Sequence, residues 1–150
     1  MTLASTLAFD PDAPKARELF DYWRTTVGFT LRGASVRHTV YLTQPVTSSY
    51  QSFSAQGTVG NLSFANTLRF DLDDACRFVF AQNEGSIGWQ WCDVKVTATF
   101  RATCAGFEQA RFAMSDFPMS AYLPGLLLDA ALTFTETAKT LSMSLSWRPM

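Results

Sequence analysis

The sequence predicts a mainly β fold of the α+β class: an antiparallel β-sandwich or barrel of about eight strands with one N-terminal helix packed on it. After residue 28, hydrophobic and polar residues alternate over most of the chain, which is the period of a half-buried strand. The connections between these segments are too short for crossover helices, so neighbouring strands should pair antiparallel. An amphipathic helical spacing occurs once, between residues 12 and 27.

The longest strand pattern lies between Ile87 and Cys104. From Cys92 onward, the even-numbered residues are Cys, Val, Val, Ala, Phe, Ala and Cys, and the residues between them are Asp, Lys, Thr, Thr, Arg and Thr. Successive side chains of a strand face opposite sides, so this pattern predicts one apolar face and one polar face. We expect a single central strand here.

The helix is predicted between Asp12, a candidate N-cap, and Gly28, a natural stop, with Pro14 near the first helical position. Residues 1–9 form either an arm or a first short strand. The face that would pack on the sheet consists of Ala16, Leu19, Phe20, Trp23 and Val27.

The remaining strands follow one another at short spacing, and one domain should cover residues 1–150. They are predicted at 34–43, 50–59, 62–72, 76–80, 110–114, 126–134 and 141–147, with turns at 73–74, 83–86, 105–106 and 136–140.

Composition narrows the classes of function. The 150 residues carry a net charge of −1, and 17% are charged, against roughly 25% in typical soluble domains. Nucleic-acid binding through Trp89 and Trp91 would need more cations on that surface than Lys95 and Arg101. The low charge is offset by Ser and Thr, which make up about a fifth of the chain.

The cysteines and the N-terminus indicate a soluble protein made in the cytoplasm of its producer. Cys76, Cys92 and Cys104 are odd in number and have no close-spaced pair, which argues against zinc or a disulfide framework. We expect buried free thiols in a reducing compartment. The first residues lack the basic segment and apolar run of a signal peptide, and no apolar run is long enough for a membrane helix.

No catalytic, cofactor-binding or metal-binding motif is present, so the sequence does not predict an enzyme. His38, the one histidine, lies on the apolar side of its strand, and we expect it to be partly buried and hydrogen-bonded to backbone. Asp71, Asp73 and Asp74 fall where a turn is needed and lack the ligand spacing of a calcium loop. The glycines at 85 and 88 have no Lys-Ser/Thr after them, as a phosphate loop would require.

Hydroxyl side chains occupy the polar side of several strands. A freely solvated sheet usually displays Lys and Glu there. Small hydroxyls allow another surface to approach closely with little loss of side-chain entropy, although the strand preference of Thr explains part of the pattern. The predicted partner-contact residues are Thr133, Thr135, Ser142, Ser144 and Ser146.

These observations predict a structural or interaction protein, a small β-rich subunit of a larger assembly built from copies of itself or from other proteins. A phage or virus particle is one such setting. The alternative is a lipocalin-like barrel that binds a small apolar ligand in a cavity lined by its Phe residues, although no Gly-x-Trp motif lies near the first strand. An enzyme would require His38 to meet a carboxylate across the sheet.

Overall fold

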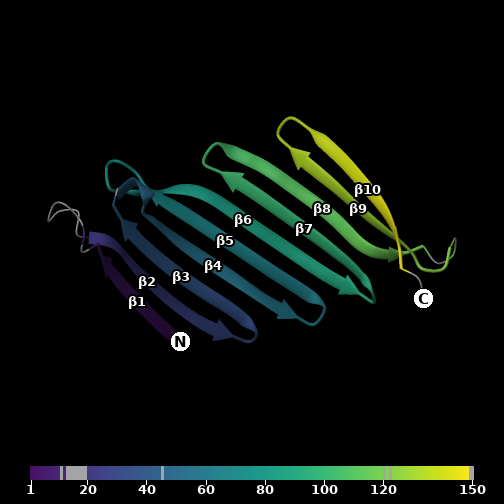
Figure 1. Ribbon diagram of the computed structural model, residues 1–150, viewed down its shortest axis with the longest axis horizontal. Coiled ribbons are helices and arrows are strands. Elements are labelled where there is room, and N and C mark those ends of the chain that lie inside the picture. The colour runs from purple at the N-terminus through teal and green to yellow at the C-terminus, as the bar shows by residue number, and fades with distance from the viewer. Residues whose placement is uncertain (11, 13–19, 45, 120, 122, 149–150) are drawn as a thin grey trace. The chain divides into compact units, whose positions relative to one another are not determined.

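The computed structural model describes residues 1–10, 12, 20–44, 46–119, 121 and 123–148. This part of the chain is almost entirely β, and its ten strands hydrogen-bond in sequence order as an open antiparallel sheet (Figure 1). The strands are β1 (Thr2–Phe9), β2 (Phe20–Leu31), β3 (Ala34–Thr43), β4 (Tyr50–Val59), β5 (Leu62–Leu72), β6 (Phe78–Trp91), β7 (Val94–Thr103), β8 (Gly106–Pro118), β9 (Leu126–Thr135) and β10 (Lys139–Trp147). No helix in the described residues is long and apolar enough to cross a membrane.

The internal contacts divide the chain into two units. The first comprises residues 1–56 and 66–83, and the second comprises residues 57–65 and 84–150. Strands β1 to β3 lie in the first unit and β7 to β10 in the second, while β4, β5 and β6 contribute to both. Within each unit, the strand register decides which side chains share a face.

In the first unit, a short turn sets the pairing of β2 with β3. Arg32 and Gly33 connect β2 to β3 with φ angles of 47° and 84°, and this pair of positive values is typical of a two-residue hairpin turn. The register places Val27 opposite His38 and Trp23 opposite Leu42. The apolar residues of the three strands therefore line up on one face.

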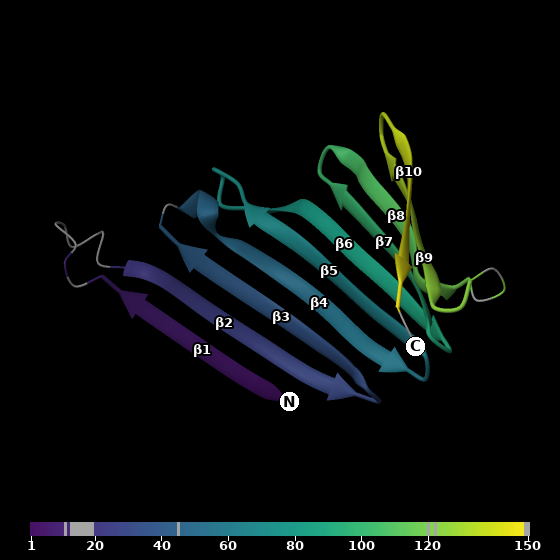
Figure 2. The same cartoon turned by 45° about the vertical axis from the view of Figure 1, so that its right-hand side comes forward.

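A row of aromatic side chains crosses the other face of the first unit, from β2 to β4, strands that Figure 2 shows side by side. The ring centroids of Tyr22 and Tyr41 lie 5.5 Å apart, and those of Tyr41 and Tyr50 lie 5.3 Å apart. The guanidinium carbon of Arg69 on β5 lies 4.5 Å from the centre of the Tyr50 ring. Such cross-strand contacts stabilise a sheet without a second layer, each by roughly 0.2–1 kcal/mol.

The predicted N-terminal helix is wrong over its described part. Residues 20–31 form β2, and residues 13–19 lie outside the described residues. Phe20, Trp23 and Val27 fit a helical spacing, but the segment is also rich in β-branched and aromatic residues, which favour a strand. Gly28 lies inside the strand opposite Thr2, whose hydroxyl donates to the Gly28 carbonyl at 3.2 Å.

The predicted central strand from 87 to 104 is two strands joined by a turn. β6 ends at Trp91 and β7 begins at Val94. Cys92 has a φ of 51°, a left-handed conformation that breaks a strand. The alternation is confirmed within β7, whereas the turn predicted at 83–86 is wrong because those residues lie inside β6.

The sheet is neither the predicted sandwich nor the predicted barrel, and its described residues form almost no hydrophobic core. Each strand pairs with its neighbours in sequence, so the chain forms an open meander. Among the described residues, Ala131 is the only buried hydrophobic side chain. Alternation specifies a face to be covered but does not specify what covers it, which is why the sequence could not predict an open sheet.

Gly125 offers a test of how the C-terminal end of the sheet is held. It has a φ of 80°, and an added Cβ would collide with the carbonyl oxygen of Arg148. Gly125→Ala should lower the free energy of unfolding by more than about 2 kcal/mol, because backbone strain and a backbone clash add together. The measurement is urea unfolding followed by circular dichroism.

Gly60→Ala is the matched control. Gly60 also has a positive φ, 58°, but a Cβ there would meet no atom within 4 Å. Its substitution should cost about 1 kcal/mol from backbone strain alone. Equal losses in the two variants would contradict the close approach of residue 148 to Gly125.

Candidate functional site

The four strands β7 to β10 in the second unit form an amphipathic surface. Val96 pairs with Met114, Phe112 with Leu132, and Leu132 with Leu141. These pairs put the hydrophobic residues of all four strands on one side, which we call the apolar face. The apolar face consists of Val96, Ala98, Phe100, Ala110, Phe112, Met114, Leu128, Ala130, Leu132, Phe134, Leu141, Met143, Leu145 and Trp147.

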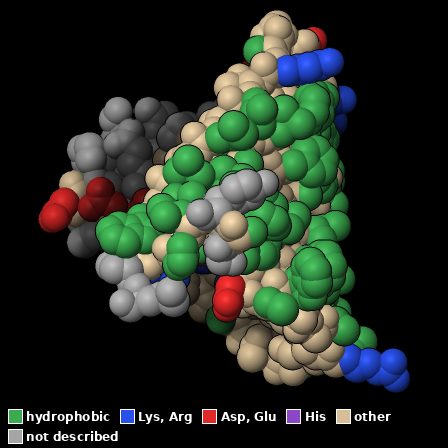
Figure 3. All heavy atoms as spheres, turned by 90° about the vertical axis from the view of Figure 1, so that its right-hand side faces the viewer, with side chains coloured by type: hydrophobic (Ala, Val, Ile, Leu, Met, Phe, Trp, Pro, Cys, Tyr) green, Lys and Arg blue, Asp and Glu red, His purple; other side chains and the backbone are tan. Residues whose placement is uncertain are grey.

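The apolar face is open to solvent. Phe112 is 52% exposed, and Met143 on the last strand is 67% exposed. The rings of Phe112 and Phe134 meet edge to face at 6.1 Å, but nothing in the described chain lies over them. Figure 3 faces the side on which β9 and β10 lie in Figure 1, and hydrophobic side chains are prominent on it. Exposed apolar surface of this extent is typical of surfaces that bind a partner, so this face is the candidate site.

The predicted partner-contact residues all lie on the opposite side of the same strands, which we call the hydroxyl face. Thr133 pairs with Thr140 and Ser142 with Ala131, so the row from β9 and the row from β10 share this side. The hydroxyl face therefore combines Thr133, Thr135, Ser142, Ser144 and Ser146. The sequence predicted the rows separately, and the register brings them together.

Small side chains leave a shallow depression in the hydroxyl face. Thr97, Ala113, Ala131 and Ser142 lie side by side on successive strands, and an open hollow of about 380 Å³ lies around the last three. The hydroxyl of Ser142 donates to the carbonyl of Ala131 at 3.4 Å. The hollow is open to solvent, and Arg111 and Asp129 also line it.

Charged groups near this region are tied into the sheet. The register of β8 shifts between Met114 and Phe117, and the carboxylate of Asp129 accepts a hydrogen bond from the Asp116 backbone N–H at 2.8 Å. The guanidinium of Arg148 contacts Asp116 at 3.2 Å. These bonds satisfy groups at the bulge and indicate a structural role.

His38 is partly buried, as predicted, and it packs among aromatic side chains. Its ring stacks on Phe53 with centroids 4.3 Å apart, and Phe53 continues into an edge-to-face row with Phe70 and Phe80. The His38 Nε2 atom is buried and has no hydrogen-bond partner, in contrast to the expected backbone bond. The aromatic contacts make this histidine part of the packing of the first unit.

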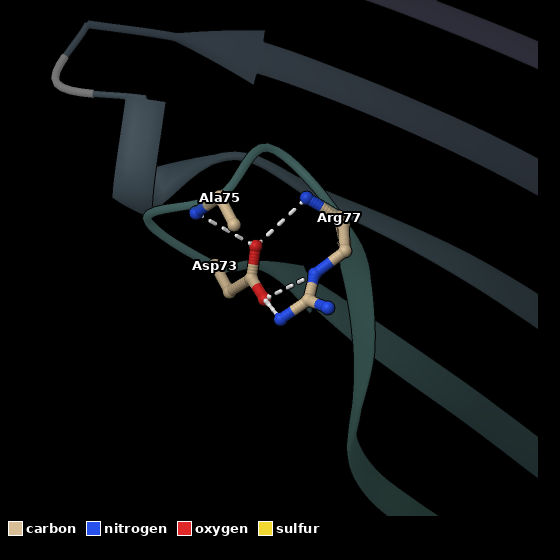
Figure 4. Close-up of polar contacts among 3 residues, drawn as sticks. All are labelled: Asp73, Ala75 and Arg77. Carbon is tan, nitrogen blue, oxygen red and sulfur yellow. Dashed lines mark hydrogen bonds and ion pairs between the residues drawn. The ribbon is translucent and has the colours of Figure 1, made fainter.

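Asp73 and Asp74 lie in the turn that the sequence predicted, whereas Asp71 lies inside β5. Asp73 accepts hydrogen bonds from the backbone N–H groups of Ala75 and Arg77, and its carboxylate contacts the Arg77 guanidinium at 2.9 Å (Figure 4). The backbone N–H of Arg77, followed by its side chain, lowers the pKa of Asp73 below its usual value. Asp71 pairs with Arg69 at 2.6 Å. Among the described residues, no group of His, Cys, Asp and Glu has the arrangement of a metal site.

The prediction of buried thiols is wrong. Cys76, Cys92 and Cys104 are unpaired, but all three are exposed and lie between strands. Cys76 and Cys92 have positive φ angles of 57° and 51°. Strand alternation placed Cys92 and Cys104 on an apolar face, whereas each lies just beyond an end of β7.

Comparison with known proteins provides no functional assignment. No protein-family model matches the chain, and searches of curated proteins and of solved structures give no match. The sequence reasoning missed the apolar face as a candidate site because it assumed that this face lay inside the protein. Its signal, the alternation in β7 to β10, was present in the sequence.

The Asp73 turn generates a prediction about acid stability. Because its folded pKa is lowered, Asp73 stabilises the fold above its unfolded pKa, and this contribution is lost as the pH falls through the folded value, below about pH 4. Asp73→Asn should therefore flatten the decline of the urea midpoint between pH 5 and about pH 2.5. Arg77→Gln should keep most of the decline, because it retains the backbone N–H. Identical pH profiles for wild type and Asp73→Asn would contradict this assignment.

Exposure of the cysteines predicts fast labelling of the folded protein. Native protein should react with three equivalents of a thiol reagent at rates within about tenfold of the denatured chain. Cys104→Ser should lower the total to two equivalents without changing the other rates. Protection of any of the three thiols in the native protein would argue against their position at the turns.

Proposed function

We propose that this protein is a structural or interaction protein that works as a subunit of a larger protein assembly. The observation that supports the proposal is the exposed apolar face of β7 to β10. A phage or virus particle, the setting considered from the sequence, is one assembly of this type.

The free energy that burial of the exposed hydrophobic side chains would contribute favours binding of a partner protein. Burying a large apolar side chain contributes about 1.5–3 kcal/mol, and a half-exposed one has gained roughly half of that. Eight such side chains on the apolar face forgo on the order of 10 kcal/mol, which is comparable to the entire net stability of a domain. Coverage by another protein surface would supply that stabilisation.

The two outer strands of the sheet also favour assembly. β1 and β10 lie at its edges, and each presents unpaired backbone groups. β1 carries no charged residue, and β10 carries none after Lys139. Edges of free-standing sheets usually carry charges, prolines or bulges that prevent pairing with another chain. β10 pairs with β9 without a register shift and has none of these protections beyond its first residue.

The hydroxyl face is a second contact surface within the same proposal. Its Ser and Thr side chains are short, and its depression lies around Ala113, Ala131 and Ser142. A partner approaching the depression would meet these short side chains with Arg111 and Asp129 beside them, so it would have to offer charges that match both. The lipocalin-like alternative is not proposed, because a ligand barrel needs a closed sheet and this sheet is open.

The proposal predicts that purified protein forms species larger than one chain of 16.7 kDa in native mass spectrometry and analytical ultracentrifugation. Ser142→Lys combined with Ser144→Lys should leave the circular dichroism unchanged but reduce the largest species, because lysines on the hydroxyl face resist desolvation. A single-chain species at all concentrations, in purified form and in extracts of the producing cells, would refute an assembly role.

A further inference from the structure

We propose that the apolar face is covered by the apolar face of a second copy of this chain, so that two copies form a β-sandwich. This inference rests on the proposed function and names the partner. Facing sheets pack about 10 Å apart with interdigitating side chains, and this is the usual way for an amphipathic antiparallel sheet to cover its apolar side. The face supplies one of the two layers of such a sandwich.

The accessible surface is large enough for this contact. Eight large apolar side chains of this face are 36–67% exposed. At roughly 150–250 Å² for each large side chain, they present on the order of 600–1,000 Å². A standard interface buries about 800 Å² on each partner, so contact between two identical faces fits this size.

The arrangement of large and small side chains on the apolar face also suits packing against a second sheet. Small residues alternate with large ones across the strands: Ala98 lies beside Phe112, and Ala110 lies between Phe100 and Phe134. Large side chains next to hollows are what two interdigitating layers require. A flat leucine surface would lack this feature.

Charge distinguishes a second copy from a lipid surface. Among the described residues, Lys139 at the margin is the one charged side chain that the register places on this side of β7 to β10, so two copies can approach without like-charge repulsion in the centre. Surfaces that bind membranes carry cations around their apolar residues. Here Lys95, Arg101 and Arg111 lie on the hydroxyl face and point away.

Neighbouring positions on β10 provide a matched test. Met143 and Ser144 are successive exposed residues of one strand and face opposite sides. Met143→Lys should raise the dimer dissociation constant at least about 100-fold in analytical ultracentrifugation, because it replaces an apolar side chain buried in the contact with a charge that would have to be desolvated. Ser144→Lys should leave it unchanged, because the new lysine lies beside Asp129 on the paired strand. Equal effects, or no effect of either, would overturn the inference.

A thiol-protection measurement keeps the test valid if Met143→Lys fails to fold. The background is Cys76→Asn, Cys92→Asn and Cys104→Ser, since Asn tolerates the positive φ at the first two positions. In this background, Met143→Cys should react slowly with N-ethylmaleimide in the dimer and quickly after dilution to monomer. Ser144→Cys should react quickly at both concentrations.

The outcomes separate this inference from the proposed function. The purified protein could be a monomer whose residue 143 reacts quickly, while the same residue is protected inside the producing cells. That result would show that the partner is not a second copy, and it would leave the assembly role in place. A residue 143 that reacts in purified protein and in cells would count against both. If neutral phosphatidylcholine vesicles protect residue 143 and the protein forms no dimer without them, the apolar face binds lipid. That result would also overturn both the second copy and the assembly role.

Discussion

The structure depends on the fact that backbone hydrogen bonding and hydrophobic burial are satisfied by different means in a single-layer sheet. Backbone donors and acceptors of the inner strands pair with the strands beside them, which needs no second layer. Apolar side chains need contact above the sheet, and within the described chain only Ala131 is buried. The described part of the fold therefore has its hydrogen-bond framework without the hydrophobic core that usually accompanies it.

Cross-strand side-chain contacts provide the stabilisation that a single layer can offer by itself. In the first unit they form the tyrosine row that ends at Arg69 on one side and the row from His38 to Phe80 on the other. Each pair contributes roughly 0.2–1 kcal/mol, so these rows together supply only part of the net stability of about 5–15 kcal/mol that a domain usually has. Their main effect is to fix the register of the strands. The histidine and the aromatic residues, which could suggest a chemical site, are explained by this packing.

The sequence predicted what depends on local alternation and missed what depends on distant contacts. The faces of β7, β9 and β10 follow directly from period two, and so does the separation of Ser142 from Met143. The helix prediction failed because Trp23 and Val27 share a face at a period of two as well as at the helical period. Phe20 fits only the helical period, and in the structure a register shift between Ala8 and Phe9 accommodates it in the pairing of β2 with β1. The prediction of buried cysteines failed because a residue in the left-handed conformation, such as Cys92, ends a strand without interrupting the alternation of residue types. Closure could not be predicted, since the pattern of one strand is the same in a barrel, a sandwich and an open sheet.

Face contact and edge contact are not equivalent ways to complete this sheet. Adding another strand beside β10 pairs one row of backbone groups, but it lengthens the apolar face and increases the uncovered hydrophobic surface. Packing a second layer on the apolar face removes that surface and leaves the edges as they were. Because covering the apolar face stabilises the sheet more than one added row of hydrogen bonds does, face contact should come first, and edge pairing between two-layered units should follow. In such a two-layered unit the hydroxyl face would point outward, where Lys95, Arg111 and Asp129 stay solvated, so a further contact on that side would need charges of the opposite sign.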